Sequence, residues 1–225
     1  MDYAERYYHQ LDGSTRHENI WPQKRLVLIE SQEEALALQH IISRLEGFKP
    51  KQRWWRRWVK RSAVALILRE QSGHIEVLMI KRADREGDPW SGHMAFPGGR
   101  MDRPDVTGLR TAMRETEEET GIILERAGHC IGRLSDIVSR PHSGRQPMVV
   151  TPYVFRLHIA VKIEPNHEVA EAVWVPLRFL MDGGNRESMT WGRGKLKITL
   201  PCYFYEKRRI WGMSLRMMDE LLALI

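Results

Sequence analysis

The stretch FPGGRMDRPDVTGLRTAMRETEEETG, residues 96–121, joins a double glycine to a segment crowded with acids, and the fold is inferred outward from it. Residues 107–120 have the spacing of an amphipathic helix. On a helical wheel, Glu115, Glu118 and Glu119 share an arc about 100° wide. The three carboxylates are therefore placed together on one side of the predicted helix rather than scattered around it.

The opposite side of the same helix forms a stripe that faces the core. Its members are Leu109, Ala112, Met113, Thr116 and Thr120. Glu117 lies outside both the stripe and the acidic arc.

Like charges three and four positions apart repel by a few tenths of a kcal/mol per pair, and a divalent cation would turn that repulsion into coordination. Hard oxygen donors of this kind suit Mg²⁺ or Mn²⁺, which complete their coordination with substrate phosphates. The pattern predicts metal-dependent phosphate chemistry.

A longer motif surrounds the acids. The sequence GGRMDRPDVTGLRTAMRETEEETGI, residues 98–122, resembles the signature of the Nudix hydrolases. That pattern reads glycine, five residues, glutamate, seven residues, Arg-Glu, an aliphatic residue, any residue, Glu-Glu, any residue, glycine and an aliphatic residue. The match from Arg114 to Ile122 is close, with Thr116 at a position that is usually aliphatic.

The resemblance implies a fold and a site. The fold is a Nudix-type α/β/α sandwich around a mixed β-sheet, in the α/β class. The implied reaction is Mg²⁺- or Mn²⁺-dependent hydrolysis of the pyrophosphate bond in a nucleoside diphosphate linked to another group. Glu115, Glu118 and Glu119 would hold the metal and serve catalysis, and Arg114 would orient a glutamate.

The loop before the helix departs from the family pattern because it is one residue longer. Counted back from Arg114, the first signature glutamate falls on Val106; counted forward from Gly99, it falls on Asp105. Valine can neither orient an arginine nor bind a metal. We expect Asp105 or Asp102 to take over part of this position, with Asp105 as a further metal ligand.

A second likeness concerns the substrate. The sequence VLMIKRADREGDPWSGHMAFPGG, residues 77–99, is similar to the Nudix branch that cleaves coenzyme A and related compounds. We expect Arg82, Gly98, Gly99 and Glu168 to contact the substrate. The resemblance implies a general base, for which Glu118, Glu119 and a glutamate from the loop around Glu168 are the candidates. ADP-ribose, other nucleotide sugars, dinucleotides and nucleoside triphosphates are alternative substrates, and a non-catalytic module that binds nucleotide or nucleic acid is an alternative of another class.

The chain divides into two parts in this scheme. Residues 1–60 form an amino-terminal helical extension, including a capped helix at 31–46, and residues 61–225 form the Nudix domain. Short apolar runs bounded by turn residues predict strands at 62–70, 74–82, 128–138, 148–161 and 171–177, followed by a hairpin region over 185–212. The apolar face of 214–225 predicts a last helix.

The basic stretch RWWRRWVKR, residues 53–61, would place its tryptophans on one side of a helix and its arginines on the other. A role at a membrane surface or on nucleic acid is conceivable. The favoured prediction is that the tryptophans pack on the domain while the arginines face water, because one short basic stretch is a weak motif.

Composition sets the remaining expectations. A net charge of +6 with 42% hydrophobic residues predicts a globular protein that attracts anions. Cys130 and Cys202 are too few for a disulfide framework or a zinc site, which favours a reducing cytoplasm. No apolar run is long enough to cross a bilayer. The expected partner is a small nucleotide rather than a nucleic acid, and a homodimer is compatible with the resemblance.

Overall fold

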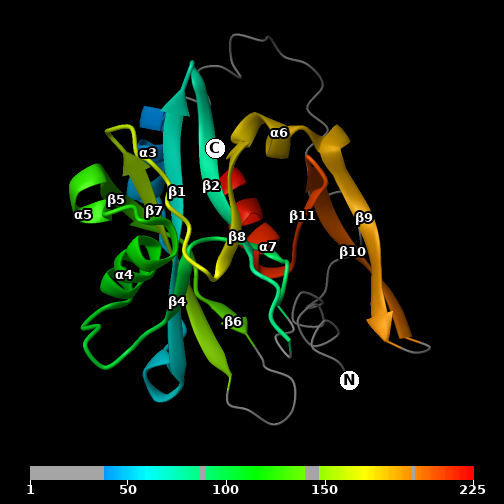
Figure 1. The fold of residues 1–225 in the computed structure, drawn as a ribbon, viewed down its shortest axis with the longest axis horizontal. Coiled ribbons are helices and arrows are strands. Elements are labelled where there is room, and N and C mark those ends of the chain that lie inside the picture. The colour runs from blue at the N-terminus through cyan, green and yellow to red at the C-terminus, as the bar shows by residue number, and fades with distance from the viewer. Residues whose placement is uncertain (1–37, 87–89, 140–146, 194–195) are drawn as a thin grey trace.

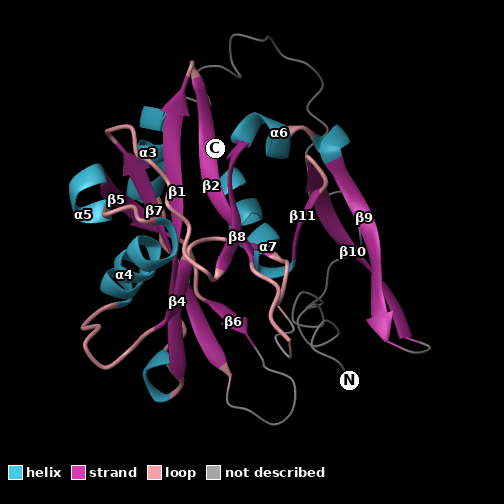
Figure 2. Ribbon diagram, viewed as in Figure 1, coloured by secondary structure: helices cyan, strands magenta, loops and turns pink. Residues whose placement is uncertain are grey.

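The computed structural model describes residues 38–86, 90–139, 147–193 and 196–225. A twisted mixed sheet forms its centre, with helices on both faces (Figures 1 and 2). The strands of this sheet are β1 (Lys60–Gln71), β2 (His74–Arg82), β3 (Met94–Ala95), β4 (Gly98–Arg100), β5 (Gly128–Arg133), β6 (Ile137–Ser139), β7 (Met148–Leu157) and β8 (Val169–Pro176). The main path runs β3-β2-β1-β7-β5, while β4 pairs with β1, β6 with β7 and β8 with β2.

The sheet is mixed because of one pairing. Strands β1 and β7 run parallel, from Lys60 opposite Met148 to Leu68 opposite Arg156, and every other pairing in this sheet of the described chain is antiparallel. The first predicted hairpin is present, with β1 and β2 joined by a turn in which Gly73 has a φ of 75°. The apolar runs seen in the sequence are therefore strands buried on both faces.

Alternating side chains of β1 point into two separate cores. Ala63, Ala65 and Ile67 pack toward α4 (Gly108–Thr120) and α5 (Leu124–Ala127). Leu66 and Leu68 pack on the opposite side with α3 (Leu38–Gly47), α6 (Leu177–Met181) and α7 (Gly212–Leu222). The predicted sandwich of helices around a mixed sheet is confirmed.

A second, smaller sheet lies beyond α7 (Figure 1). Its strands are β9 (Arg186–Arg193), β10 (Leu196–Tyr205) and β11 (Arg208–Trp211), and the short helix η2 (Gly183–Asn185) leads into it. Tyr203 and Ile210 from this sheet share a core with Met218 of α7. The predicted hairpin region is thus a three-stranded antiparallel sheet, and the helix predicted at the end of the chain packs against it.

Local signals set both ends of α4. Thr107 caps the amino end, where its hydroxyl accepts the N–H of Arg110 at 3.3 Å. Gly121 ends the helix with a φ of 73°, and its N–H donates to the carbonyl of Glu117 at 2.8 Å. Glycine takes this left-handed conformation without the steric cost that other residues meet. The helix predicted at 107–120 is present.

The basic stretch at 53–61 differs from its prediction. It forms a single turn of 3₁₀-helix, η1 (Arg56–Trp58), and β1 begins at Lys60. Trp54 and Trp58 are 78% and 58% exposed, so the prediction that the tryptophans pack on the domain is wrong for these two. Of the helix predicted at 31–46, residues 38–46 are helical, and the first part lies outside the described residues. The boundary at residue 60 stays a prediction.

Candidate active site

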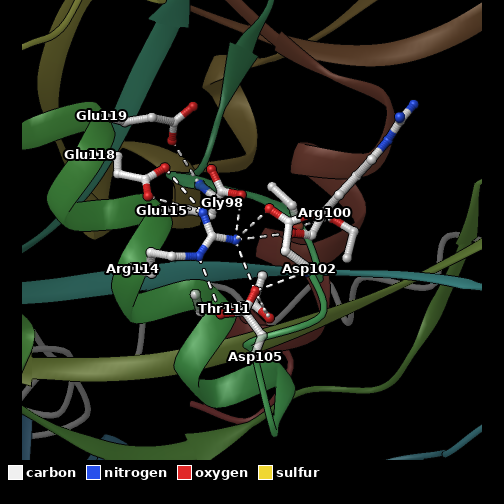
Figure 3. Close-up of polar contacts among 12 residues, drawn as sticks. Gly98, Arg100, Asp102, Asp105, Thr111, Arg114, Glu115, Glu118 and Glu119 are labelled. Atoms are coloured by element: carbon white, nitrogen blue, oxygen red, sulfur yellow. Dashed lines mark hydrogen bonds and ion pairs between the residues drawn. The ribbon is translucent and has the colours of Figure 1, made fainter.

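Arg114, on α4, lies at the centre of a cluster of acids (Figure 3). Its Nε donates to Oδ1 of Asp105 at 3.2 Å, and its Nη2 donates to Oδ2 of the same carboxylate at 2.8 Å. This two-point contact holds the guanidinium in one plane. Asp102 is a looser partner at 3.7 Å, and Val106 is 86% exposed.

The loop and α4 together hold Asp105 in place. Its side chain is buried, and its Oδ2 accepts the N–H of Asp102 at 3.0 Å and lies 3.1 Å from the Thr111 hydroxyl. The hydrogen bonds from Arg114 lower the pKa of Asp105 from its ordinary value of 3.8 to about 2, although burial opposes the shift. Asp105 is therefore charged at neutral pH.

Arg114 also reaches two glutamates of the predicted acidic arc. Its Nη1 donates to both oxygens of Glu118 at 3.1 and 3.0 Å, and its Nη2 donates to Oε1 of Glu115 at 3.0 Å. The carbonyl oxygen of Arg100 accepts a further bond from Nη2 at 3.1 Å. Burial raises the pKa of Glu115, and the nearby charge of Arg114 opposes that rise. Arginine and acids thus form one connected network.

Glu119 lies deeper than its place on the helical wheel suggested. It is 4% exposed, and its Oε2 accepts the N–H of Gly98 at 2.8 Å. Burial raises its pKa to about 7, the hydrogen bond from Gly98 opposes this, and the charge of Glu115 adds to it. Around neutral pH this carboxyl group can hold or release a proton.

The two glycines of β4 permit this close packing. Gly98 has a φ of 151°, and a Cβ there would overlap the backbone of Ala63 and Val64. A Cβ on Gly99 would overlap the carboxyl group of Glu115. Their proximity to β1 is fixed by the Ser62 hydroxyl, which donates to the carbonyl of Gly99 at 2.7 Å. The double glycine therefore lets the backbone approach both the strand and the acids.

Two of the predicted substrate residues lie at the edge of this cluster. The charges of Arg82 and Glu168 both act on Glu119, in opposite directions. The side chain of Glu168 pairs with Arg85 at 2.9 Å, and the backbone of Ala83 donates to its carbonyl at 2.8 Å. Arg85 was not anticipated, because a single loop arginine carries no periodic signal.

The donor chemistry of the site fits a hard divalent cation. Glu115, Glu118 and Glu119 present carboxylate oxygens from one helix, and Mg²⁺ and Mn²⁺ prefer oxygen donors of this kind. Within the described ranges, no three acidic, histidine or cysteine side chains already stand as a metal-binding group. Arg114 engages Glu115 and Glu118, while Glu119 turns to Gly98, so binding an ion requires these side chains to change partners.

The comparison with known families identifies the domain. A model of the NUDIX domain matches residues 59–196, more than half of the chain. The chain belongs to the Nudix family. The resemblance inferred from the signature is confirmed, and Asp105 rather than Val106 is the residue that contacts the signature arginine of this Nudix domain.

Two curated relatives of this Nudix protein illustrate its place in the family. An uncharacterized protein of Schizosaccharomyces pombe, C14C4.10c, is 39% identical over 47% of this chain and 33% of its own length. The human mitochondrial coenzyme A diphosphatase NUDT8 is 29% identical over 68% of this chain and 64% of its own length. The chain thus spans a third to just under two thirds of these relatives. The likeness to the coenzyme A branch is confirmed.

A solved structure of an Ap4A hydrolase from C. elegans is 23% identical, with a TM-score of 0.43, over 55% of this chain and 84% of that chain. In the described part of the Nudix protein, every helix is too short or too polar to cross a bilayer.

Proposed function

We propose that this Nudix protein hydrolyses the pyrophosphate bond of a nucleoside diphosphate linked to another group, with Mg²⁺ or Mn²⁺ as cofactor and coenzyme A or a derivative as substrate. The observation that carries the proposal is the gathering of Glu115 and Glu118 around an arginine that Asp105 holds, with Glu119 on the same helix against Gly98. The name of the human relative, a coenzyme A diphosphatase, supports the substrate.

In this proposal the three glutamates of α4 hold the metal. The bound ion supplies positive charge against the phosphate oxygens of the substrate. The double glycine keeps bare backbone beside the acids, which leaves space for the substrate's phosphates to approach. Asp105 is the least suited of the predicted ligands, because Arg114 occupies both of its oxygens.

In this proposal Arg114 positions the glutamates and takes no part in the reaction itself. Its contact with Asp105 fixes the guanidinium, which in turn orients Glu118 through Nη1 and Glu115 through Nη2. Such a chain of contacts holds the acids at defined places before the substrate arrives. Removal of Asp105 therefore acts on the acids through Arg114.

The proton from the attacking water goes to a carboxylate. Glu119 is one candidate, because it is buried against the backbone of Gly98 and lies on the same helix as the other two acids. Glu118 is another, and it is more accessible. Glu168 is the third, at the edge of the cluster beside Arg85. Arg82 is close enough for its charge to act on Glu119, and in this proposal it meets a phosphate of the substrate.

The test is a substrate panel with Mg²⁺ or Mn²⁺ and product analysis by mass. We expect metal-dependent cleavage of coenzyme A into two phosphorylated fragments. Glu118→Gln and Glu119→Gln should each lower the rate at least about 100-fold. Glu117→Gln is the matched control, because Glu117 is an exposed glutamate of the same helix that points away from the cluster. It should retain the rate of the native protein.

Other outcomes have clear meanings. Cleavage of ADP-ribose, a dinucleotide or a nucleoside triphosphate in place of coenzyme A would change the substrate and keep the chemistry. An equal loss of hydrolysis rate in Glu117→Gln and Glu118→Gln would contradict the catalytic role given to the glutamates of α4. A folded protein that retains a nucleotide intact, with and without EDTA, would mark a binding module instead of an enzyme.

A further inference from the structure

A turn at the amino end of β1 presents aromatic side chains to solvent. We call residues 51–61 the basic tryptophan turn. Trp54 and Trp58 are 78% and 58% exposed, and their rings meet edge to face with centroids 5.4 Å apart. Large exposed aromatic groups that lie together mark a contact surface more often than chance exposure does. We propose that this turn docks on the surface of a bilayer that contains anionic phospholipid.

The turn is held outward by a buried acid. Asp136 accepts the backbone N–H of Arg53 at 2.9 Å and pairs with the Arg56 guanidinium at 3.3 Å. The N–H of Asp136 donates to the carbonyl of Lys51 at 2.9 Å, and the N–H of Lys51 donates to the Ser135 hydroxyl at 2.9 Å. The backbone on the amino-terminal side of both tryptophans is therefore fixed to the domain, and the exposed rings are not the end of a loose segment.

The charge of the turn complements an anionic surface. The sequence holds no aspartate or glutamate between Glu46 and Glu70. Asp136 compensates Arg56 and Arg133. In the described part of the chain, no carboxylate pairs with Lys51, Arg57 or Lys60, which leaves these cations available to lipid headgroups. Clustered lysine and arginine near the surface raise affinity for anionic membranes.

The ring geometry favours a bilayer over nucleic acid. Bases of single strands stack on the free faces of aromatic rings. The guanidinium of Arg57 lies 4.2 Å from the centroid of the Trp58 ring and covers one face, and Trp54 meets the same ring at 81°. Membrane interfaces instead take indoles at headgroup level, with the apolar body inward and the N–H in water. A pair of indoles this exposed suits insertion at headgroup level.

The turn adjoins the loop of the candidate active site. The N–H of Met101 donates to the carbonyl of Arg61 at 2.9 Å, and the same loop exposes Val106. A lipid surface contacting the turn would therefore lie near the loop that carries Asp105. The docking itself needs none of the acids of α4, so it can be tested apart from hydrolysis.

The experiment is sedimentation of the full chain with vesicles. We expect binding to phosphatidylcholine vesicles that contain phosphatidylglycerol, weaker binding at high salt, and little binding to phosphatidylcholine alone. Trp54→Ala/Trp58→Ala and Arg57→Glu/Lys60→Glu should each weaken binding at least about tenfold. The matched controls are Ile159→Ala, an exposed apolar residue elsewhere, and Lys162→Glu, an exposed lysine elsewhere.

Metal-dependent hydrolysis measured without vesicles should be unchanged in the turn variants, since none of their residues contacts the candidate site. If the double tryptophan variant does not fold, the single variant Trp54→Ala takes its place in the vesicle-binding experiment. The proposal is overturned if Ile159→Ala weakens vesicle binding as much as the tryptophan variant does, or if binding does not depend on the anionic lipid. Salt-sensitive binding to single-stranded RNA without any binding to vesicles would also overturn it.

Discussion

Arg114 contacts both carboxylate oxygens of Asp105, and Val106, the next residue, points into solvent. The signature counted back from Arg114 reaches Val106, which cannot make this contact. The extra residue in the loop shifts the chain so that an aspartate meets the arginine instead. The departure from the family pattern is therefore one of register, and an acid still faces the guanidinium.

Asp105→Ala should damage both the fold and the reaction. The substitution leaves the Arg114 guanidinium without its two-point partner and should lower the free energy of unfolding by about 1–3 kcal/mol. Hydrolysis should fall with it, because Arg114 would no longer hold Glu115 and Glu118. Urea unfolding and initial rates measure the two effects. Val106→Ala is the neighbouring control and should change neither; equal effects of the two substitutions would contradict this role of Asp105.

Acid should remove the stabilisation that Asp105 provides. Its pKa is about 2 in the folded protein against an ordinary value of 3.8, so the unfolded chain binds the proton more tightly. The contribution is complete above roughly pH 4 and is lost as the pH falls toward about 2. The difference in urea midpoint between the native protein and Asp105→Asn should be large at neutral pH and shrink below roughly pH 4. A difference independent of pH would exclude this linkage.

Gly99→Ala should disturb the site more than the fold. The new Cβ would overlap the carboxyl group of Glu115, which is the mobile end of a side chain and can move away at small cost in stability. Moving it takes a proposed metal ligand from its place. We expect weaker Mn²⁺ binding, by about tenfold or more, with a nearly unchanged melting temperature. Gly183→Ala is the control, because a Cβ at Gly183 has nothing within 4 Å, and it should leave both the Mn²⁺ affinity and the melting temperature unchanged. Normal Mn²⁺ affinity in Gly99→Ala would show that a Cβ at this position does not displace Glu115.

Asp136→Asn tests the anchor of the basic tryptophan turn. Asp136 is buried and meets Arg56, Arg133 and the Thr151 hydroxyl, so losing its charge should lower the free energy of unfolding by about 2–4 kcal/mol. Glu125→Gln removes an exposed pair with Arg110 and should cost less than about 1 kcal/mol. Chemical denaturation measures the free energy of unfolding of both variants. Similar costs for the two substitutions would show that the network does not hold the turn.

Much of the fold follows from periodicity. Strands β1 and β2 are apolar runs bounded by turn residues, and α4 has a cap, a stripe and a terminal glycine, each a local signal. The burial of Glu119 could not be derived this way, since it depends on Gly98, which is 21 residues earlier and reaches Glu119 only through the pairing of β4 with β1. Helical spacing shows which side chains share a face, and not what covers that face.

The basic tryptophan turn shows the opposite limit. A helical wheel placed its tryptophans on one side, and a wheel is informative only where the backbone is a helix. Asp136, far along the chain, binds the backbone of Arg53, and the end of the stretch, from Lys60, pairs with β7 as a strand. Asp105 is intermediate, because counting from each end of the motif left two candidates, and only the loop geometry selects between them.

The parallel pairing of β1 with β7 also bears on the order in which the protein folds. It joins Lys60 to Met148 and Leu68 to Arg156, so the central strand finds this neighbour only after most of the domain has been synthesised. Such distant pairings form slowly, because closing a long loop has a large entropic cost. Strand β4, whose Gly98 donates its N–H to Glu119, rests on β1. A nascent chain that ends before β7 would thus carry every acid of the signature while β1, on which β4 rests, still lacks its parallel neighbour.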